Sequence, residues 1–182
     1  THSTHRHLDP KEKKKVKKQL LEICKTIPSL TIFLLPGGSL LVSNEPVPQR
    51  NSILRDNLSK WGQVNVIITQ NEPIDFASLK DYFDVILVDA PCSGEGLFRK
   101  NHDAVNEWSE STLVMCSLRQ KTILEDILPA LKPNGLLIYS TCTYNEGEND
   151  AICEKLLEEG VMDPLDLEPI HGATKTKFGL QM

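Results

Sequence analysis

The stretch FDVILVDAPCSGEG, residues 83–96, decides the fold class, because an apolar run ends abruptly in chemically reactive side chains. Residues 83–89 form an almost continuous apolar run, which is typical of a strand buried on both faces of a parallel sheet. Asp89, Pro91 and Cys92 stand at its end. Ligands of open α/β sheets bind outside the carboxyl ends of the strands. The stretch therefore predicts a parallel sheet with a functional site at the end of this strand.

Short apolar runs that end in polar residues recur along the chain and alternate with predicted helices. Strands are predicted at 39–44, 64–69, 83–89 and 135–141, and helices at 10–25, 46–62, 111–131 and 146–159. Apolar runs that do not alternate and are separated by helices indicate a parallel sheet. The fold class expected is therefore α/β, with a mostly parallel sheet and helices on both faces.

Composition limits the class of protein. Hydrophobic residues make up 40% of the chain, and no apolar run approaches the roughly 20 residues that span a bilayer. No signal peptide is visible, so we expect a cytoplasmic protein without a membrane partner. The five cysteines are odd in number and form no CxxC pair, which favours free thiols. The three histidines among residues 1–7 have no obvious partner ligands, so no metal is expected.

The net charge of −5 conceals a basic N-terminal segment. Residues 1–25 hold eight Lys/Arg and three Asp/Glu, so this segment carries +5 and the remainder −10. Its lysines can meet phosphates, or they can form the solvated face of a helix, and the sequence leaves both readings open. We predict a basic helical segment of unclear origin at 1–33, followed by an α/β domain at 34–182.

Polar side chains follow each predicted strand, at Asn44 and Glu45, Gln70 to Glu72, Asp89 to Cys92, and Thr141 to Thr143. We expect these strand ends to share one crevice. A carboxylate after the second strand of a nucleotide-binding α/β unit accepts both hydroxyls of a ribose, and Glu45 is placed for that. Alternatively, Glu45 is only a favourable charge at the start of the next helix. Glu72 could similarly lie beside an adenine ring.

Two of the cysteines stand in polar turns directly after predicted strands. Cys92 follows Pro91 in one turn, and Cys142 lies between two threonines in the other. A thiol is a good nucleophile only as thiolate, which needs a partly exposed and polar setting. The remaining cysteines, Cys24, Cys116 and Cys153, are interpreted as small buried hydrophobes. The two turns are therefore the candidates for thiol chemistry.

The motif DAPCSGEGLFRK (89–100), followed by LIYSTCTYNEGEN (137–149), resembles the pair of active-site motifs of the Sun-type RNA (cytosine-5) methyltransferases. The most similar branch is the bacterial one that modifies 16S ribosomal RNA. Further segments resemble the same branch: VSNEPVPQR (42–50), NVIITQNEP (65–73), EWSES (107–111) and Arg119-Gln120. The resemblance runs from about Gly38 to the end of the chain, and two cysteine motifs in register make it specific.

This resemblance implies a Rossmann-like methyltransferase fold and methylation of carbon-5 of cytosine in RNA by S-adenosylmethionine. Carbon-5 is too weakly nucleophilic to attack a methyl sulfonium unaided, so a thiolate first attacks carbon-6. In this family the later thiol is the nucleophile, which implies Cys142. The thiol of the earlier motif assists breakdown of the covalent adduct, which implies Cys92.

The resemblance assigns further residues to the site. Asp89 would hold the cytosine edge, and Pro91 would fix the turn through its preset φ. Arg99 and Lys100 would steer RNA phosphates toward a base that has left its stack. The residues implied for S-adenosylmethionine are Glu45, Asn71, Glu72 and Asp89, together with the glycines of a loop at Gly37 and Gly38.

This glycine loop departs from the family pattern. Pro36-Gly37-Gly38 resembles its core, but Ser39 stands where the family has lysine, and a strand begins at once, without the intervening helix. We interpret these glycines as a turn before the strand, and the chain as a partial catalytic domain that lacks the first strand and the final strands. The alternative is a non-catalytic RNA-binding or assembly module. A small-molecule or protein methyltransferase is disfavoured, because neither needs two thiols.

Overall fold

The computed structural model describes residues 39–62, 65–98, 105–106, 108–165 and 172–181. The helix predicted at 10–25 lies outside this part of the chain. The contacts divide the chain into two units, residues 1–72 and residues 73–182. Each unit is described by itself. No helix in the described ranges is long and apolar enough to cross a membrane.

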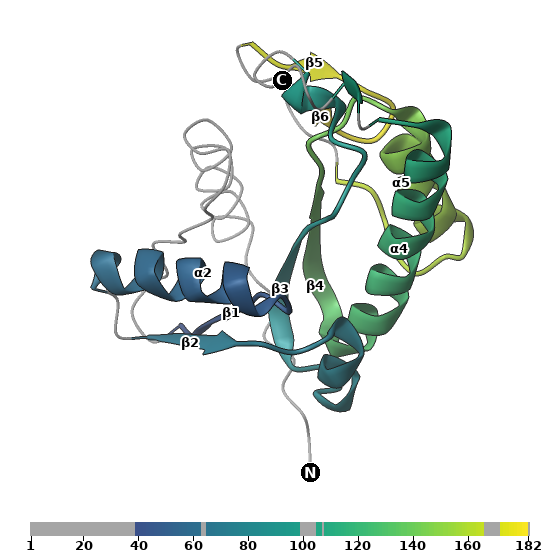
Figure 1. Cartoon of the computed structure of the whole chain (residues 1–182). Helices are drawn as coiled ribbons and strands as arrows, with labels where there is room; N and C mark the ends of the chain where they lie inside the picture. The colour runs from purple at the N-terminus through teal and green to yellow at the C-terminus, as the bar shows by residue number, and fades with distance from the viewer. Residues whose placement is uncertain (1–38, 63–64, 99–104, 107, 166–171, 182) are drawn as a thin grey trace. The chain divides into compact units, whose positions relative to one another are not determined.

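The first unit is built from β1 (Leu41–Asn44), α2 (Pro48–Trp61) and β2 (Val66–Thr69). The two strands pair in parallel, from Leu41 opposite Val66 to Asn44 opposite Thr69. Parallel neighbours need a crossover connection, and α2 supplies it beside the strand pair (Figure 1). Pro48 begins the helix, where its missing N–H costs nothing, and Gly62 ends it in the left-handed conformation at φ 65°.

A buried asparagine joins the helix of this unit to both of its strands. Asn51 of α2 is 2% exposed. Its Nδ2 donates to the carbonyl of Glu45 at 3.0 Å and to the carbonyl of Thr69 at 2.6 Å. Both carbonyls lie at the carboxyl ends of the strands, so this side chain fixes the edge at which the predicted site residues Glu45 and Asn71 lie.

The second unit is a strand–helix–strand unit followed by a further helix and a short hairpin. Its elements are η1 (Pro73–Ser78), β3 (Phe83–Asp89), η2 (Glu95–Leu97), α4 (Glu110–Ile127), η3 (Leu128–Ala130), β4 (Leu131–Ser140), η4 (Glu146–Glu148), α5 (Asp150–Glu158), β5 (Thr174–Lys175) and β6 (Leu180–Gln181). β3 and β4 pair in parallel, and β5 and β6 antiparallel. Ser109 caps α4 by accepting the N–H of Thr112 at 3.2 Å.

Both α4 and α5 lie along the same side of the β3–β4 pair (Figure 1). The buried apolar residues of this unit include Ile86 and Val88 of β3, Leu124 of α4 and Ile152 of α5, each at most 8% exposed. Val85, which alternates with Ile86 along β3, is 37% exposed. The predicted α/β class with parallel strands is confirmed, whereas helices on both faces of one sheet remain a prediction.

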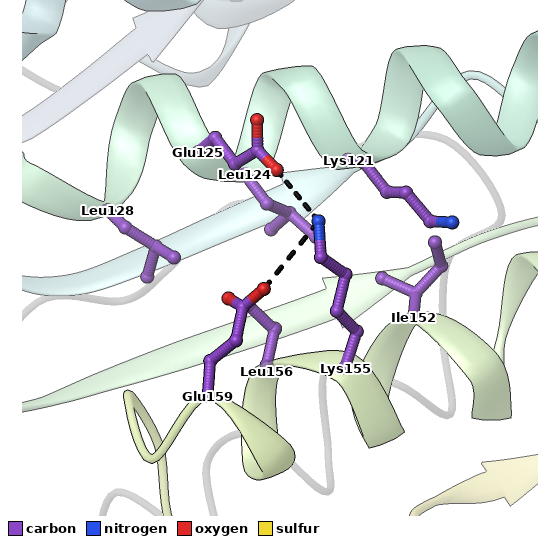
Figure 2. A pocket seen from close by; sticks show the side chains of 8 residues that line it. All are labelled: Lys121, Leu124, Glu125, Leu128, Ile152, Lys155, Leu156 and Glu159. Atoms are coloured by element: carbon purple, nitrogen blue, oxygen red, sulfur yellow. Dashed lines mark hydrogen bonds and ion pairs between the residues drawn. The ribbon is translucent and has the colours of Figure 1, made fainter.

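Figure 2 shows the shallow groove in which α4 and α5 meet. Leu124, Leu128 and Leu156 are among its apolar lining residues. Lys155 closes it by bridging Glu125 at 2.8 Å, with Glu159 at 3.7 Å. Such exposed ion pairs contribute little to stability. The groove contains neither candidate thiol, so it is a helix-packing feature.

Element boundaries differ from the sequence prediction in one instructive place. The predicted helix at 111–131 ends at Ile127, and β4 begins at Leu131 rather than at 135. Leu131 pairs with Phe83 and Leu136 with Val85, so the Lys-Pro-Asn-Gly segment is a bulge within the strand. Pro133 and Gly135 correctly indicated an irregularity in the chain. The strand accommodates these residues as a bulge instead of beginning after them.

Two smaller differences follow from element length. The predicted helix at 146–159 is divided into η4 and α5, with Asn149 between them. β5 and β6 were not predicted. At two residues each, they are too short for a periodic pattern to indicate them.

Candidate active site

The pairing of β3 with β4 brings the two cysteine turns together. Asp89 lies opposite Ser140, so the chain leaves both strands at the same level of the sheet. Cys92 and Cys142 follow, and their Sγ atoms are 2.9 Å apart. The N–H of Cys142 also donates to Sγ of Cys92 at 3.2 Å. The four cysteines in the described ranges are all free, so this is a pair of thiols in contact.

The two thiols differ in their surroundings. Cys142 is exposed, whereas Cys92 is partly buried. Burial, followed by the hydrogen bond to the Cys142 thiol, raises the pKa of Cys92 to about 12. Cys92 is therefore protonated at neutral pH, and Cys142 is the thiol that a ligand can reach.

A glycine allows the turn after β3 to contact the turn after β4. The N–H of Gly96, in η2, donates to the carbonyl of Cys142 at 2.8 Å. A Cβ at position 96 would lie 2.6 Å from that same oxygen, closer than a side-chain carbon can approach. Glycine is therefore required here to hold the backbone of Cys142, a role that the sequence analysis did not assign.

The loop that carries Cys142 is held by its own asparagines. Asn149 accepts the hydroxyl of Thr141 at 2.6 Å and donates to the carbonyls of Thr143 and Asn145 at 3.0 Å. Asn145 accepts the N–H of Gly147 at 2.9 Å. Side-chain amides thus take the place of the backbone hydrogen bonds that end with β4. Both residues belong to the NEGEN part of the motif, which was the available sequence signal.

The buried carboxylate of Glu148 connects the two cysteine turns through hydrogen bonds. Glu148 is fully buried, and its carboxylate accepts hydrogen bonds from the N–H and the hydroxyl of Ser93, at 2.9 and 2.5 Å. It also accepts from Nε2 of Gln120, on α4, at 2.9 Å. Glu148 and Gln120 both lie within the family motifs, but their role was not predicted, because burial cannot be read from a motif.

The other site residues of this unit lie beside the thiols. Asp89 is exposed at the end of β3 and accepts the hydroxyl of Ser140 at 3.1 Å. The carbonyl of Pro91 accepts a hydrogen bond from Nε2 of Gln120 at 2.9 Å, so a side chain of α4 holds the turn. Asp89 thus presents a carboxylate with remaining acceptor capacity at the strand end where the thiols lie.

The acids predicted for the cofactor lie in the first unit. One carboxylate oxygen of Glu45 accepts the N–H of Val47 at 3.0 Å, and the other pairs with Arg50 at 2.8 Å. Glu45 therefore does interact with the start of α2, as the alternative interpretation expected. Asn71 and Glu72 are exposed at the end of β2, where the backbone of Asn71 bonds to Asn44 in both directions, at 2.9 Å.

This edge of the first unit fits the nucleoside part of S-adenosylmethionine chemically. Glu45, Asn71 and Glu72 follow two adjacent parallel strands. A carboxylate with one hydrogen bond on each oxygen keeps lone pairs for hydroxyl groups. Asp89 belongs to the other unit. The remaining candidates, Gly37, Gly38, Arg99 and Lys100, lie outside the described residues.

Solved structures of methyltransferases share this fold. NSun6 from Pyrococcus horikoshii, solved with SFG, matches with a TM-score of 0.60 at 23% identity, over 67% of this chain and 31% of that one. A methyltransferase homolog protein from the same organism matches with a TM-score of 0.52 at 32% identity, over 66% and 37%. The fold is thus that of S-adenosylmethionine-dependent methyltransferases.

The sequence comparison narrows this class to one family. The family model for 16S rRNA methyltransferase RsmB/F matches residues 7–182, and the chain belongs to this family. Ribosomal RNA small subunit methyltransferase F of Aeromonas salmonicida is 42% identical over 127 residues, which are 69% of this chain and 27% of that protein. The chain spans about a quarter of the length of such relatives. The resemblance seen in the two cysteine motifs is confirmed.

The family match also reaches a segment that the sequence analysis could not assign. It begins at residue 7 and so includes most of the basic segment 1–33. The boundary predicted between residues 33 and 34 remains a prediction.

Proposed function

We propose that the protein to which this chain belongs methylates carbon-5 of cytosine in 16S ribosomal RNA through a covalent adduct between a cysteine and carbon-6. The observation that carries this proposal is the contact of two free thiols, 2.9 Å apart, at the ends of adjacent strands. Methylation of an oxygen or nitrogen requires no thiol. Methylation of an unactivated ring carbon requires a nucleophile that adds and then leaves.

Cys142 is the nucleophile in this proposal, because it is the exposed thiol of the pair. Its thiolate adds to carbon-6, and the electron pair of the 5,6 double bond becomes available at carbon-5. S-adenosylmethionine supplies the methyl group. Loss of the proton from carbon-5 and departure of the Cys142 sulfur then restore the double bond.

Cys92 serves the release step. Its hydrogen bond and electrostatic interaction with the Cys142 thiol both raise its pKa. Once Cys142 is bonded to carbon-6, it can no longer carry charge or donate a hydrogen, so these two contributions diminish. Cys92 then ionises more readily, and it stands beside the bond that must break.

The remaining residues position the cytosine, the RNA and the cofactor. Asp89 holds the cytosine edge from the end of β3, and Pro91 fixes the turn between Asp89 and Cys92. Arg99 and Lys100 contact RNA phosphates. The residues proposed for the cofactor are Glu45, Asn71 and Glu72 in the first unit and Asp89 in the second, and Gly37 and Gly38 remain candidates for the loop around its methionine part.

The proposal is tested by methyl transfer to 16S ribosomal RNA with the full-length protein. Cys142→Ser should reduce turnover by at least about 10⁴-fold, since an alcohol at this position is not ionised at neutral pH. Cys153→Ser is the matched control and should retain activity, because that thiol lies on α5, outside the two cysteine turns. Normal turnover of Cys142→Ser would contradict the assignment of the nucleophile.

The alternative function, a non-catalytic RNA-binding or assembly module, has one observation in its favour. β1 begins at Leu41, three residues after Gly38, which leaves no room for the helix that follows the glycine loop in the family pattern. RNA binding without methyl transfer by the full-length protein would support this alternative.

A further inference from the structure

Glu148 is a fully buried carboxylate that the proposed reaction does not use. It lies in η4, between β4 and α5, with no exposed surface. The three groups that bond to its oxygens, Ser93 N–H, Ser93 Oγ–H and Gln120 Nε2–H, are all donors. Burying a carboxylate is costly unless such partners surround it, so its position calls for an explanation.

The carboxylate connects the residues that directly follow the two thiols. Ser93 follows Cys92 and gives Glu148 both its N–H and its hydroxyl. The same hydroxyl lies 3.1 Å from Oγ1 of Thr143, which follows Cys142. A short chain of hydrogen bonds therefore runs from the carboxylate through one cysteine turn to the other.

The carboxylate also reaches the residue that precedes Cys92. Gln120 uses the two hydrogens of its amide on Glu148 and on the carbonyl of Pro91, both at 2.9 Å. The backbone of Glu148 is itself anchored, because Tyr139 of β4 donates its hydroxyl to the Glu148 carbonyl at 2.8 Å. The turn of Cys92 is thus held on both sides from one buried point.

We propose that Glu148 is the positioning residue of the two-thiol site: it holds the turns of Cys92 and Cys142 at the spacing that puts their sulfurs in contact. Strand register brings the turns to the same level but does not fix side chains beyond the last ladder hydrogen bond. Small errors in such spacing are costly in catalysis. The catalytic meaning of this role rests on the proposed function, whereas the spacing itself does not.

The test measures thiol proximity directly, on the 182-residue chain, without RNA or cofactor. Dibromobimane bridges two thiols that lie close together, and mass spectrometry of the linked peptides identifies Cys92 with Cys142. Glu148→Gln keeps one acceptor oxygen and replaces the other by an amide donor, so at least one of the three hydrogen bonds is lost or must reverse its direction. The bridging rate should therefore fall about tenfold, the factor expected for one lost hydrogen bond. Glu146→Gln, the same change two residues away at an exposed position, should bridge at the wild-type rate.

A second variant keeps the test decisive if Glu148→Gln does not fold. Ser93→Ala removes the shared hydroxyl and leaves the carboxylate and its amide partner, so bridging should fall by a smaller factor with an unchanged circular dichroism spectrum. Bridging at the wild-type rate in Ser93→Ala and in any folded Glu148→Gln protein would overturn the proposal.

The bridging experiment can fail or succeed independently of the methyl-transfer experiment that tests the proposed function. A full-length protein that never methylates RNA, yet loses bridging in Glu148→Gln, rejects the reaction and keeps the positioning role. An active protein in which both variants bridge normally rejects the positioning role alone. If both ideas hold, full-length Glu148→Gln should lose turnover number while its KM for RNA stays unchanged.

Discussion

At the residue scale, the two thiols of the site are unequal although their motifs look alike. Cys92 lies partly buried in the turn that follows β3, and its pKa is raised to about 12, first by burial. Cys142 extends from the end of β4 into solvent. Exposure therefore distinguishes the two thiols: Cys142 is accessible to a ligand, whereas Cys92 is partly buried.

Replacing Cys92 by serine in the full-length protein should trap the reaction partway. Attack by Cys142 does not need the Cys92 thiol, but release does, so a protein–RNA adduct should accumulate that survives denaturing electrophoresis. The double variant Cys92→Ser/Cys142→Ser is the control and should form none. Absence of the adduct in the single variant, with turnover intact, would contradict the division of labour between the thiols.

At the element scale, the site depends on how η2 packs against the end of β4. Strand register places Asp89 opposite Ser140, and the N–H of Gly96 then meets the carbonyl of Cys142. The contact is tight enough that no side chain fits at position 96. A backbone–backbone contact outside the sheet therefore continues the pairing of the strands into their loops.

Gly96→Ala should lower the free energy of unfolding by about 1–3 kcal/mol, because its Cβ overlaps the carbonyl oxygen of Cys142 and the turn must shift. Gly179→Ala is the matched control. A Cβ there meets only Thr176 Oγ1 at 3.8 Å, so the change should stay within about 0.5 kcal/mol. Denaturant unfolding of both variants checks this, and equal stabilities would contradict the packing argument.

At the scale of the whole molecule, the residues predicted for the site are divided between two units. The acids predicted for the cofactor follow β1 and β2, in residues 1–72, and the thiols follow β3 and β4, in residues 73–182. The chain spans about a quarter of its curated relatives, 27% of the Aeromonas protein. Full activity is therefore a property to be measured on the full-length protein.

Calorimetry with S-adenosylmethionine should show no micromolar binding to the 182-residue chain. The acids can hold the nucleoside part, but β1 follows Gly38 too closely for the helix of the glycine loop. A full-length family member such as the Aeromonas protein serves as the positive control. Micromolar binding to this chain would refute the interpretation that the loop is missing.

Much of the fold was predictable because its signals are local. The non-alternating run at 83–89 is β3 with identical bounds, and Gly62 ends α2 as expected. The start of β4 was missed because Pro133 and Gly135 signal a break equally well in a turn and in a bulge. Only pairing with Phe83, 48 residues earlier, makes Leu131 part of the strand.

The sequence by itself determined the α/β class, the two cysteine turns and the family, because apolar periodicity and contiguous motifs are properties of neighbouring residues. Tertiary structure alone decided that the sulfurs of Cys92 and Cys142 touch, that Gly96 must lack a side chain and that Glu148 is buried beneath both turns. Each of these depends on which residue lies opposite another some 50 positions away. Strand pairing and burial set those distances, and neither is encoded in any short stretch of the chain.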